Sequence, residues 1–216
     1  MMRLGLFGGT FDPIHQGHLD VAEAARRALQ LSCVWVVPAR VPPHRRAPAA
    51  SAAHRFAMAA IACANAPGLL LSDLEMEGAT PSYTEGTLDR LPSLGVNVGT
   101  LFLVTGADAF RDIQTWKGFP GILDRCHFVV VSRPGHSAPE LRKQLPALAS
   151  RMVDAGREMG TTPSVILVDA RTAPVSSTDI RRRLLAGEAV DDLVGPGVAA
   201  YIEKHGLYRD SSKDEA

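Results

Sequence analysis

The sequence contains little that would support a disulfide framework, a nucleic-acid surface or a membrane span. Its three cysteines, Cys33, Cys63 and Cys126, are widely spaced in apolar runs, as is typical of reduced core thiols. Lys+Arg and Asp+Glu both number 23, so the net charge of +0 gives no basis for wholesale binding to nucleic acid or anionic lipid. No apolar stretch approaches the roughly 18 residues that a membrane span requires. We therefore expect a small-molecule partner.

Length and composition predict one domain. The 216 residues, of which 46% are hydrophobic and 21% charged, suffice to bury a full core. We expect this domain to span residues 1–209 and a disordered polar tail to span residues 210–216. Because no basic segment with an apolar leader stands at the N-terminus, we also expect a soluble cytoplasmic protein. The sequence leaves homo-oligomerisation open.

Short aliphatic runs alternate with segments whose apolar residues recur at three- and four-residue spacing. The runs that we interpret as strands span residues 4–7, 34–37, 69–71, 101–104, 128–131 and 165–168. The segments that we interpret as helices span residues 19–29, 55–65, 83–91 and 140–152. Strands that are apolar throughout suit a parallel sheet covered on both faces. The expected fold class is therefore α/β, a doubly wound parallel sheet with right-handed crossovers.

Ligands of such sheets bind beyond the carboxyl ends of the strands, and the notable loops lie there. These loops span residues 8–18, 38–46, 105–108 and 132–135. The stretch 38–53 carries four prolines and three arginines, which predict a stiff basic loop.

Two histidines follow the first strand directly. Gly8 and Gly9 follow the strand, and we expect them to take backbone conformations closed to other residues and to let N–H groups approach an anion. His15 and His18 are three residues apart, so a helix that begins near Gly17 would turn both rings toward one phosphate chain. Imidazoles that donate to phosphoryl oxygens stabilise the charge that builds as pyrophosphate leaves.

Two other nucleotide-binding patterns fail on particular residues. A dinucleotide-binding fingerprint requires G-x-G-x-x-G and an acidic residue at the end of the second strand, but here the glycines are Gly5, Gly8 and Gly9. The second strand leads instead into Pro38-Ala39-Arg40. The P-loop pattern lacks its lysine.

A second motif, Ser176-Ser177-Thr178-Asp179-Ile180-Arg181-Arg182-Arg183, predicts a helix start with Ser176 or Ser177 as the N-cap. Three arginines in the first two turns would oppose the helix dipole unless a polyanion were bound there. We expect Arg181 to reach the phosphates, and Arg182 and Arg183 to be solvated.

Further polar clusters lie in the loops. The run Pro42-Pro43-His44-Arg45-Arg46 is a basic cluster stiffened by proline, suited to the phosphate of a second substrate. The run from Pro81 to Leu88 could simply start a helix, since Ser82 and Thr84 are good caps, but exposed amides at that start would also bind a small carboxylate. Gly106 and Asp108 end a strand where an acid can accept from ribose hydroxyls, and Trp116 is either a core residue or a stacking platform.

These residues resemble the nicotinate-nucleotide adenylyltransferase family of the nucleotidyltransferase superfamily, and the resemblance spans residues 3–208. Its signature is the run from Thr10 to His18 together with the Ser-Ser-Thr-Asp-Ile-Arg block. The loop clusters, Arg133-Pro134-Gly135 and the ending Tyr201-Ile202 to Gly206-Leu207-Tyr208 favour this family over its phosphopantetheine and cytidylyl relatives.

The resemblance implies a Rossmann-like nucleotidyltransferase fold and attack by the phosphate of nicotinate mononucleotide on the α-phosphorus of ATP. The products would be nicotinate adenine dinucleotide and pyrophosphate, with Mg²⁺ accompanying the ATP. Because the attacking oxygen is already anionic, no side chain need act as nucleophile or base. No carboxylate cluster predicts a protein-held metal, so Mg²⁺ would be held by ATP phosphates and water.

The resemblance also implies roles for single residues. The implied catalytic residues are His15, His18 and Arg181. The implied ATP-binding residues are Gly8, Gly9, Thr10, Phe11, Gly17, Gly106, Asp108, Ser177 and Thr178. The implied mononucleotide-binding residues are His44, Arg45, Tyr83, Thr84, Trp116 and Arg133, with Arg45 on the phosphate, Trp116 on the pyridine ring and amides near Tyr83 and Thr84 on its carboxylate.

The sequence departs from the family pattern at two positions, and two alternative functions remain open. Arg40 stands where similar sequences often have Asn, Arg45 stands where many have Lys, and residues 138–174 carry no interpretable motif. One alternative is a nucleotidyltransferase that prefers nicotinamide mononucleotide or another phosphorylated acceptor. The other is a nucleotide sensor without turnover, which would have little need for both histidines.

Overall fold

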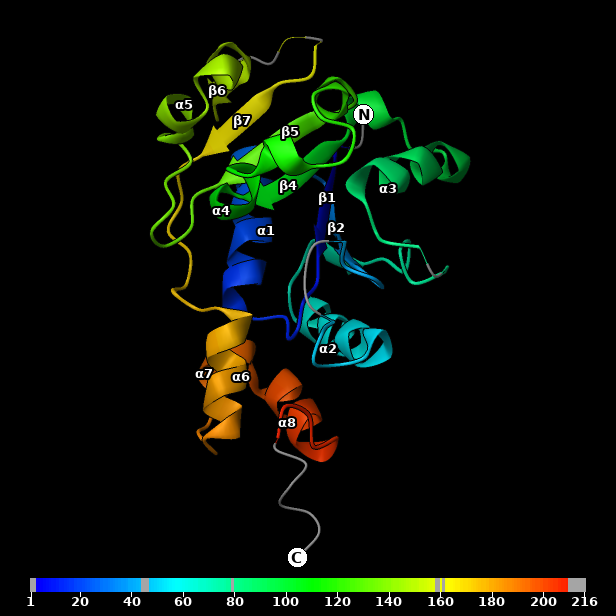
Figure 1. Cartoon of the computed structure of the whole chain (residues 1–216), viewed down its shortest axis with the longest axis vertical. Helices are drawn as coiled ribbons and strands as arrows, with labels where there is room; N and C mark the ends of the chain where they lie inside the picture. The colour runs from blue at the N-terminus through cyan, green and yellow to red at the C-terminus, as the bar shows by residue number, and fades with distance from the viewer. Residues whose placement is uncertain (1–2, 44–46, 79, 158–159, 161, 210–216) are drawn as a thin grey trace, which may run out of the picture.

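A computed structural model describes residues 3–43, 47–78, 80–157, 160 and 162–209, and these contain one seven-stranded sheet (Figure 1). The strand order is β3-β2-β1-β4-β5-β7-β6, and every neighbouring pair is parallel. The strands are β1 (Leu4–Gly9), β2 (Cys33–Pro38), β3 (Leu69–Leu71), β4 (Phe102–Gly106), β5 (His127–Val131), β6 (Met152–Asp154) and β7 (Val165–Val168). The predicted doubly wound α/β class is confirmed.

Helices cover both faces of the sheet. The α-helices are α1 (Gln16–Ala28), α2 (Ala52–Ala64), α3 (Thr84–Arg90), α4 (Ala107–Phe110), α5 (Leu141–Gln144), α6 (Ser177–Leu185), α7 (Asp191–Val194) and α8 (Pro196–Lys204). The 3₁₀ helices are η1 (Leu91–Leu94), η2 (Val98–Thr100), η3 (Ile113–Thr115), η4 (Gly121–Asp124) and η5 (Pro146–Arg151). Among the described residues, no helix has the length and apolar character needed to cross a bilayer.

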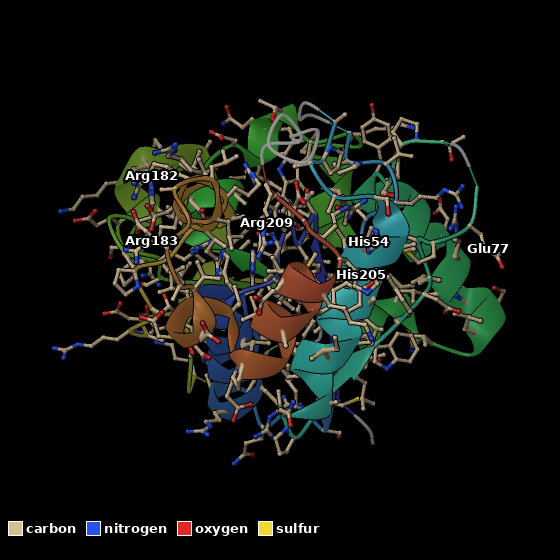
Figure 2. The ribbon with its side chains drawn as sticks, turned by 90° about the horizontal axis from the view of Figure 1, so that it is seen from below. His54, Glu77, Arg182, Arg183, His205 and Arg209 are labelled. Carbon is tan, nitrogen blue, oxygen red and sulfur yellow. The ribbon has the colours of Figure 1, made fainter. Side chains whose placement is uncertain are left out.

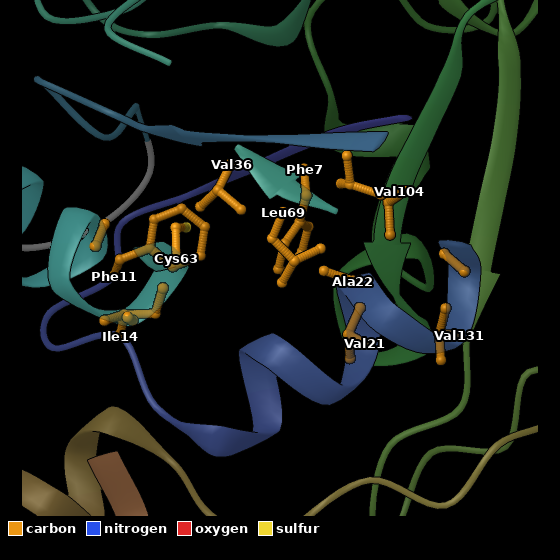
Figure 3. Packing of buried hydrophobic residues seen from close by; sticks show 14 of the residues in the cluster. Phe7, Phe11, Ile14, Val21, Ala22, Val36, Cys63, Leu69, Val104 and Val131 are labelled. Carbon is orange, nitrogen blue, oxygen red and sulfur yellow. The ribbon is translucent and has the colours of Figure 1, made fainter. Parts of the chain in front are cut away.

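Side chains alternate between two apolar cores, one on each face of the sheet. Along the central strands, Val104 and Val129 belong to the first core, whereas Leu103 and Phe128 belong to the second. The first core also receives α1, as Figure 3 shows for Val21 beside the strand side chains. Both faces are therefore buried, which is why these strands are apolar at consecutive positions.

The stretch 140–152 is not the single helix that its periodicity predicts. Helix α5 ends at Gln144, η5 begins at Pro146, and Met152 starts the edge strand β6, which the sequence analysis missed. Proline lacks an N–H and disfavours the α conformation of the residue before it, and Leu145 accordingly has φ −126° and ψ 64°.

The strand order reverses between β1 and β4, which are neighbours in the sheet. The chain connections that follow β1 and β4 run in opposite directions from this point. The carboxyl ends of these two strands therefore flank a crevice, which is where ligands bind in doubly wound sheets. Gly9 ends β1 and Gly106 ends β4. The expected loops 8–18 and 105–108 therefore meet at the switch point.

Candidate active site

The loop after β1 is shaped by the ring of Phe11. Phe11 has φ +50° and is buried, and a Cβ added at Gly9 would lie 2.8 Å from that ring. Gly9 is thus required because a side chain would collide with Phe11. Neither Gly8 nor Gly9 has a positive φ among the described glycines, so the expectation that they take conformations closed to other residues is wrong.

His15 and His18 meet at the start of α1. His15 is the N-cap residue, and its backbone N–H donates to Nδ1 of His18 over 3.3 Å. The two imidazole rings stack with centroids 3.7 Å apart, and Phe11 meets the His18 ring edge-on at 5.0 Å. Because Nδ1 of His18 accepts this bond, a neutral His18 ring carries its proton on Nε2.

His15 is the buried member of the pair, only 2% exposed. Burial, reinforced by the positive charge of Arg133, lowers the pKa of His15 from 6.5 to about 3. Its imidazole is therefore neutral at physiological pH. Among the described residues, Nδ1 of His15 is a buried polar side-chain atom without a hydrogen-bond partner.

The second motif docks directly on the first. Ser177 Oγ donates to the carbonyl of Pro13 over 3.0 Å, and Arg181 Nη1 donates to the carbonyl of Asp12 over 2.6 Å. Arg181 Nη2 also reaches Thr178 Oγ1 at 3.3 Å. In Figure 1, α6 lies beside the loop between β1 and α1 although the two are far apart in sequence. The structure brings the two sequence motifs together in one place.

Close packing between the segment before α6 and helix α1 supports this contact. A Cβ at Gly17 would lie 3.2 Å from the carbonyl oxygen of Ala173. Nearby, the backbone N–H of Ala173 donates to Asp20 Oδ2 over 2.8 Å. The absence of a side chain at Gly17 therefore favours the close approach of these two chain segments.

In helix α6, two of the three arginines do not lie where the sequence predicted a conflict with the helix dipole. Ser176 is the N-cap, as expected, and its hydroxyl accepts from the Asp179 N–H over 3.1 Å. Arg182 and Arg183 lie in the last turn of this short helix, where the dipole favours positive charge. They pair with Asp179 at 2.5 and 2.9 Å, and Figure 2 shows both on α6. The dipole conflict predicted for these two residues does not exist.

Gly106, Asp108 and Arg133 form a second wall of the switch point. A Cβ at Gly106 would collide with Asp108 Oδ1 and lie 2.8 Å from Arg133 Cδ. Arg133 Nη1 lies 3.5 Å from Asp108 Oδ2, and Nη2 donates to the carbonyl of Val175 over 3.3 Å. Arg133 therefore lies between the ribose candidate and the segment leading into α6, and its assignment to the mononucleotide stays a prediction.

Of the predicted mononucleotide-binding residues that the structure describes, Tyr83 lines a hollow beside the start of α3. A cavity of about 380 Å³ is lined by Glu75, Glu77, Thr80, Pro81, Ser82, Tyr83, Gly86, Thr87, Arg90 and Lys117. Tyr83, rather than Ser82 or Thr84, is the N-cap of α3, and Lys117 Nζ stands 5.1 Å over its ring.

Trp116 lies at the edge of the second core. Trp116 is partly buried against the second core, with its ring centroid 6.4 Å from that of Phe128. Its neighbour Lys117 lines the cavity. His44 and Arg45 lie outside the described residues, as does the tail 210–216.

Three buried charged residues near the site received no role from sequence. Asp12 is 6% exposed, Arg55 is 1% exposed and Glu75 is 8% exposed. Burial raises the pKa of Glu75, whose carboxyl group accepts from the hydroxyl of Thr87. The sequence signal for Arg55 was an arginine inside the apolar pattern of α2.

Comparison with known proteins agrees with this geometry. The family described as Cytidylyltransferase-like matches residues 6–183. The probable nicotinate-nucleotide adenylyltransferase of Cronobacter sakazakii is 38% identical over 208 residues, covering 94% of each chain. That of Roseiflexus sp. (strain RS-1) is 41% identical over 213 residues, covering 95% of this chain and 98% of the relative.

A solved structure shares the fold. Plasmodium falciparum nicotinic acid mononucleotide adenylyltransferase complexed with NaAD superposes with a TM-score of 0.72 at 20% identity, covering 96% of this chain and 98% of that one. With the histidine loop and the serine-arginine helix joined at the switch point, and with relatives about 40% identical over nearly the whole chain, this protein belongs to the nicotinate-nucleotide adenylyltransferase family.

Proposed function

We propose that this protein transfers the adenylyl group of ATP to nicotinate mononucleotide, forming nicotinate adenine dinucleotide and pyrophosphate. The observation that carries the proposal is the junction of the two motifs, in which Ser177 and Arg181 bond to the backbone of Pro13 and Asp12. The bond of Arg181 to Asp12 joins α6 to the loop that carries His15 and His18, at the edge of the sheet where doubly wound folds bind ligands, and this supports the proposal. Relatives named for this activity support the choice of substrates.

The triphosphate side of the reaction needs donors. His18 presents Nε2–H because its Nδ1 accepts from the His15 backbone, and it donates to a phosphoryl oxygen. His15 stays neutral, so no positive charge is stacked against the ring of His18. Arg181, held on the Asp12 carbonyl, contributes the fixed positive charge, and Ser177 and Thr178 flank it.

The transfer itself is an in-line displacement. An anionic oxygen of the mononucleotide phosphate attacks the α-phosphorus, the bond to the β-phosphate oxygen breaks, and pyrophosphate leaves with its electron pair. Charge grows on the leaving group, where preorganised donors lower the barrier by about 3 to 4 kcal/mol each in comparable sites. No covalent protein intermediate is required.

The remaining roles complete the proposal. Asp108, beside the close approach at Gly106, accepts from the adenosine ribose. Backbone amides at the start of α3, near Tyr83 and Thr84, receive the pyridine carboxylate beside the cavity that Tyr83 lines. Trp116 stacks on the ring, and His44 and Arg45 take the phosphate.

Mg²⁺ would enter with the nucleotide and neutralise phosphate charge. The described residues contain no group of three or more His, Cys, Asp or Glu side chains placed to hold a metal ion. The carboxylate of Asp12 is occupied by N–H and O–H donors, and that of Asp108 faces Arg133. The donor set thus fits a cation carried by ATP phosphates and water. A cytoplasmic location stays a prediction.

The test is a product assay with matched variants. Purified protein is incubated with ATP, Mg²⁺ and either nicotinate or nicotinamide mononucleotide, and dinucleotide and pyrophosphate are quantified. We expect strong preference for the nicotinate form, a large loss in Arg181→Gln, and near-normal turnover in Arg182→Gln, whose side chain pairs with Asp179 on the exposed side of α6. Preference for nicotinamide mononucleotide would keep the adenylyl transfer but change the acceptor to the amide. No product from either acceptor would refute the proposal.

A further inference from the structure

The buried carboxylate of Asp12 is a junction between three segments of the chain. Its Oδ2 accepts from the N–H of Ala49 over 2.7 Å, and its Oδ1 accepts from the N–H of Ala50 over 3.0 Å. The third donor is the hydroxyl of Tyr208, 2.8 Å from Oδ1 and 196 residues away in sequence. Only the tyrosine hydroxyl can be removed by substitution without touching the backbone.

The same aspartate holds Arg181. Its main-chain carbonyl accepts from Arg181 Nη1 at 2.6 Å, while its carboxylate Oδ2 lies 3.8 Å from that nitrogen. The guanidinium thus has two competing acceptors on one residue. If the carboxylate lost the Tyr208 donor, its buried charge would attract the guanidinium more strongly and turn it away from the phosphate side.

Arg55 and Tyr208 hold the segments on either side of this arrangement in place. Arg55, 1% exposed, donates to the carbonyls of Thr10, Ala39, Arg40 and Ala50, which sets the segments that flank Asp12. Tyr208 has φ +63°, a conformation that a tyrosine rarely adopts. Burial and the charge of Asp12 raise the pKa of Tyr208, so its hydroxyl remains a donor across the physiological range.

We infer that Tyr208 is a positioning residue for adenylyl transfer: its hydroxyl occupies the Asp12 carboxylate and thereby keeps Arg181 on the Asp12 carbonyl, oriented toward the triphosphate of ATP. The inference rests on the proposed function for the role of Arg181. It assigns the C-terminal tyrosine to the ATP side of the site.

Tyr208→Phe tests the inference, with Tyr201→Phe as the matched control. Tyr201 lies on α8, and its hydroxyl bonds to Nδ1 of His54 at 3.0 Å, away from Asp12. Figure 2 shows His54 and His205 together at α2 and α8. Both variants lose one tyrosine hydroxyl that has a side-chain partner, so a general effect on folding would appear in both melting temperatures.

We expect Tyr208→Phe to lower kcat and ATP affinity by about tenfold each, as for a lost hydrogen bond to a charged group, and to leave the KM for nicotinate mononucleotide unchanged. Tyr201→Phe should match the wild type in all three. Equal kinetics in the two variants, or a loss confined to melting temperature, would overturn the inference and leave Tyr208 structural.

A double-mutant cycle that combines Tyr208→Phe with Arg181→Gln tests whether Tyr208 acts through Arg181. If Tyr208 acts through Arg181, the two losses do not add, because Tyr208→Phe has nothing left to misplace. Fully additive losses would contradict the inference. Should Tyr208→Phe not fold, Tyr208→His, which retains an N–H donor, carries the test: ATP affinity within threefold of wild type supports the role, and a full tenfold loss opposes it.

ATP binding by calorimetry, without any acceptor, separates this inference from the proposed function. Failure of the proposed function shows as a wild type that makes no dinucleotide. Failure of the inference shows as equal ATP dissociation constants in Tyr208→Phe and Tyr201→Phe, whichever acceptor the wild type uses.

Discussion

The buried imidazole of His15 makes a quantitative prediction about pH and stability. The side chain is 2% exposed, stacks on His18 and faces the charge of Arg133, and its pKa falls from 6.5 to about 3. The perturbation is His15→Asn, because asparagine is a good N-cap residue and does not titrate in this range. The substitution therefore removes the titration while keeping a residue suited to the start of α1.

The sign follows from proton counting. Between the two pKa values the unfolded chain binds a proton that the folded protein does not, so stability present above pH 6.5 is lost as the pH falls toward 3. Each pH unit in this window changes the free energy of unfolding by about 1.4 kcal/mol. Lowering the pH to about 5 should therefore remove about 2 kcal/mol through His15 alone.

The assay is urea unfolding of both proteins at a series of pH values from about 7.5 to 5, with m-values compared at each. The wild type should lose about 2 kcal/mol more than His15→Asn over this range. Burial also lowers the pKa of His127, but that effect is common to both proteins and cancels. Parallel curves would refute the burial and electrostatic reasoning for His15.

Three further predictions concern the site and the core. His18→Ala should lower turnover by roughly 10²- to 10³-fold with far less effect on ATP binding, because it removes a donor to developing charge; equal losses in both measurements would exclude that role. Trp116→Ala should raise the KM for the mononucleotide at constant kcat, and an unchanged KM would assign Trp116 to the core. Burial raises the pKa of Cys63 to about 11 and of Cys126 to about 12, so both should resist alkylation at neutral pH until urea unfolds the protein; rapid labelling of the native protein would contradict their burial.

The parts predictable from sequence are those set by neighbouring residues. Consecutive aliphatic residues specified a sheet covered on both faces, and the structure has it. The N-cap at Ser176 and the contact between His15 and His18 both involve residues three positions apart. Such spacing can be read directly from the local sequence. A family resemblance added the expectation that the two motifs share one site.

The parts that sequence could not provide depend on contacts between distant residues. Asp12 stands inside a quoted motif, yet its partner Tyr208 is 196 positions away and no local pattern links them. Gly9 was attributed to backbone freedom, but the structure assigns the requirement to the ring of Phe11. Strand β6 has three residues and follows a proline-broken helix, so it left no periodicity to detect.

The central claim is that this site moves an adenylyl group directly from ATP to the mononucleotide phosphate. The most direct measurement is a single turnover with ATP radiolabelled at the α-phosphorus, compared with ATP labelled at the γ-phosphorus, each with nicotinate mononucleotide. We predict the α label in the dinucleotide, the γ label in pyrophosphate, and no label on acid-quenched protein. Label retained on the protein, or α label released without entering a dinucleotide, would contradict the account.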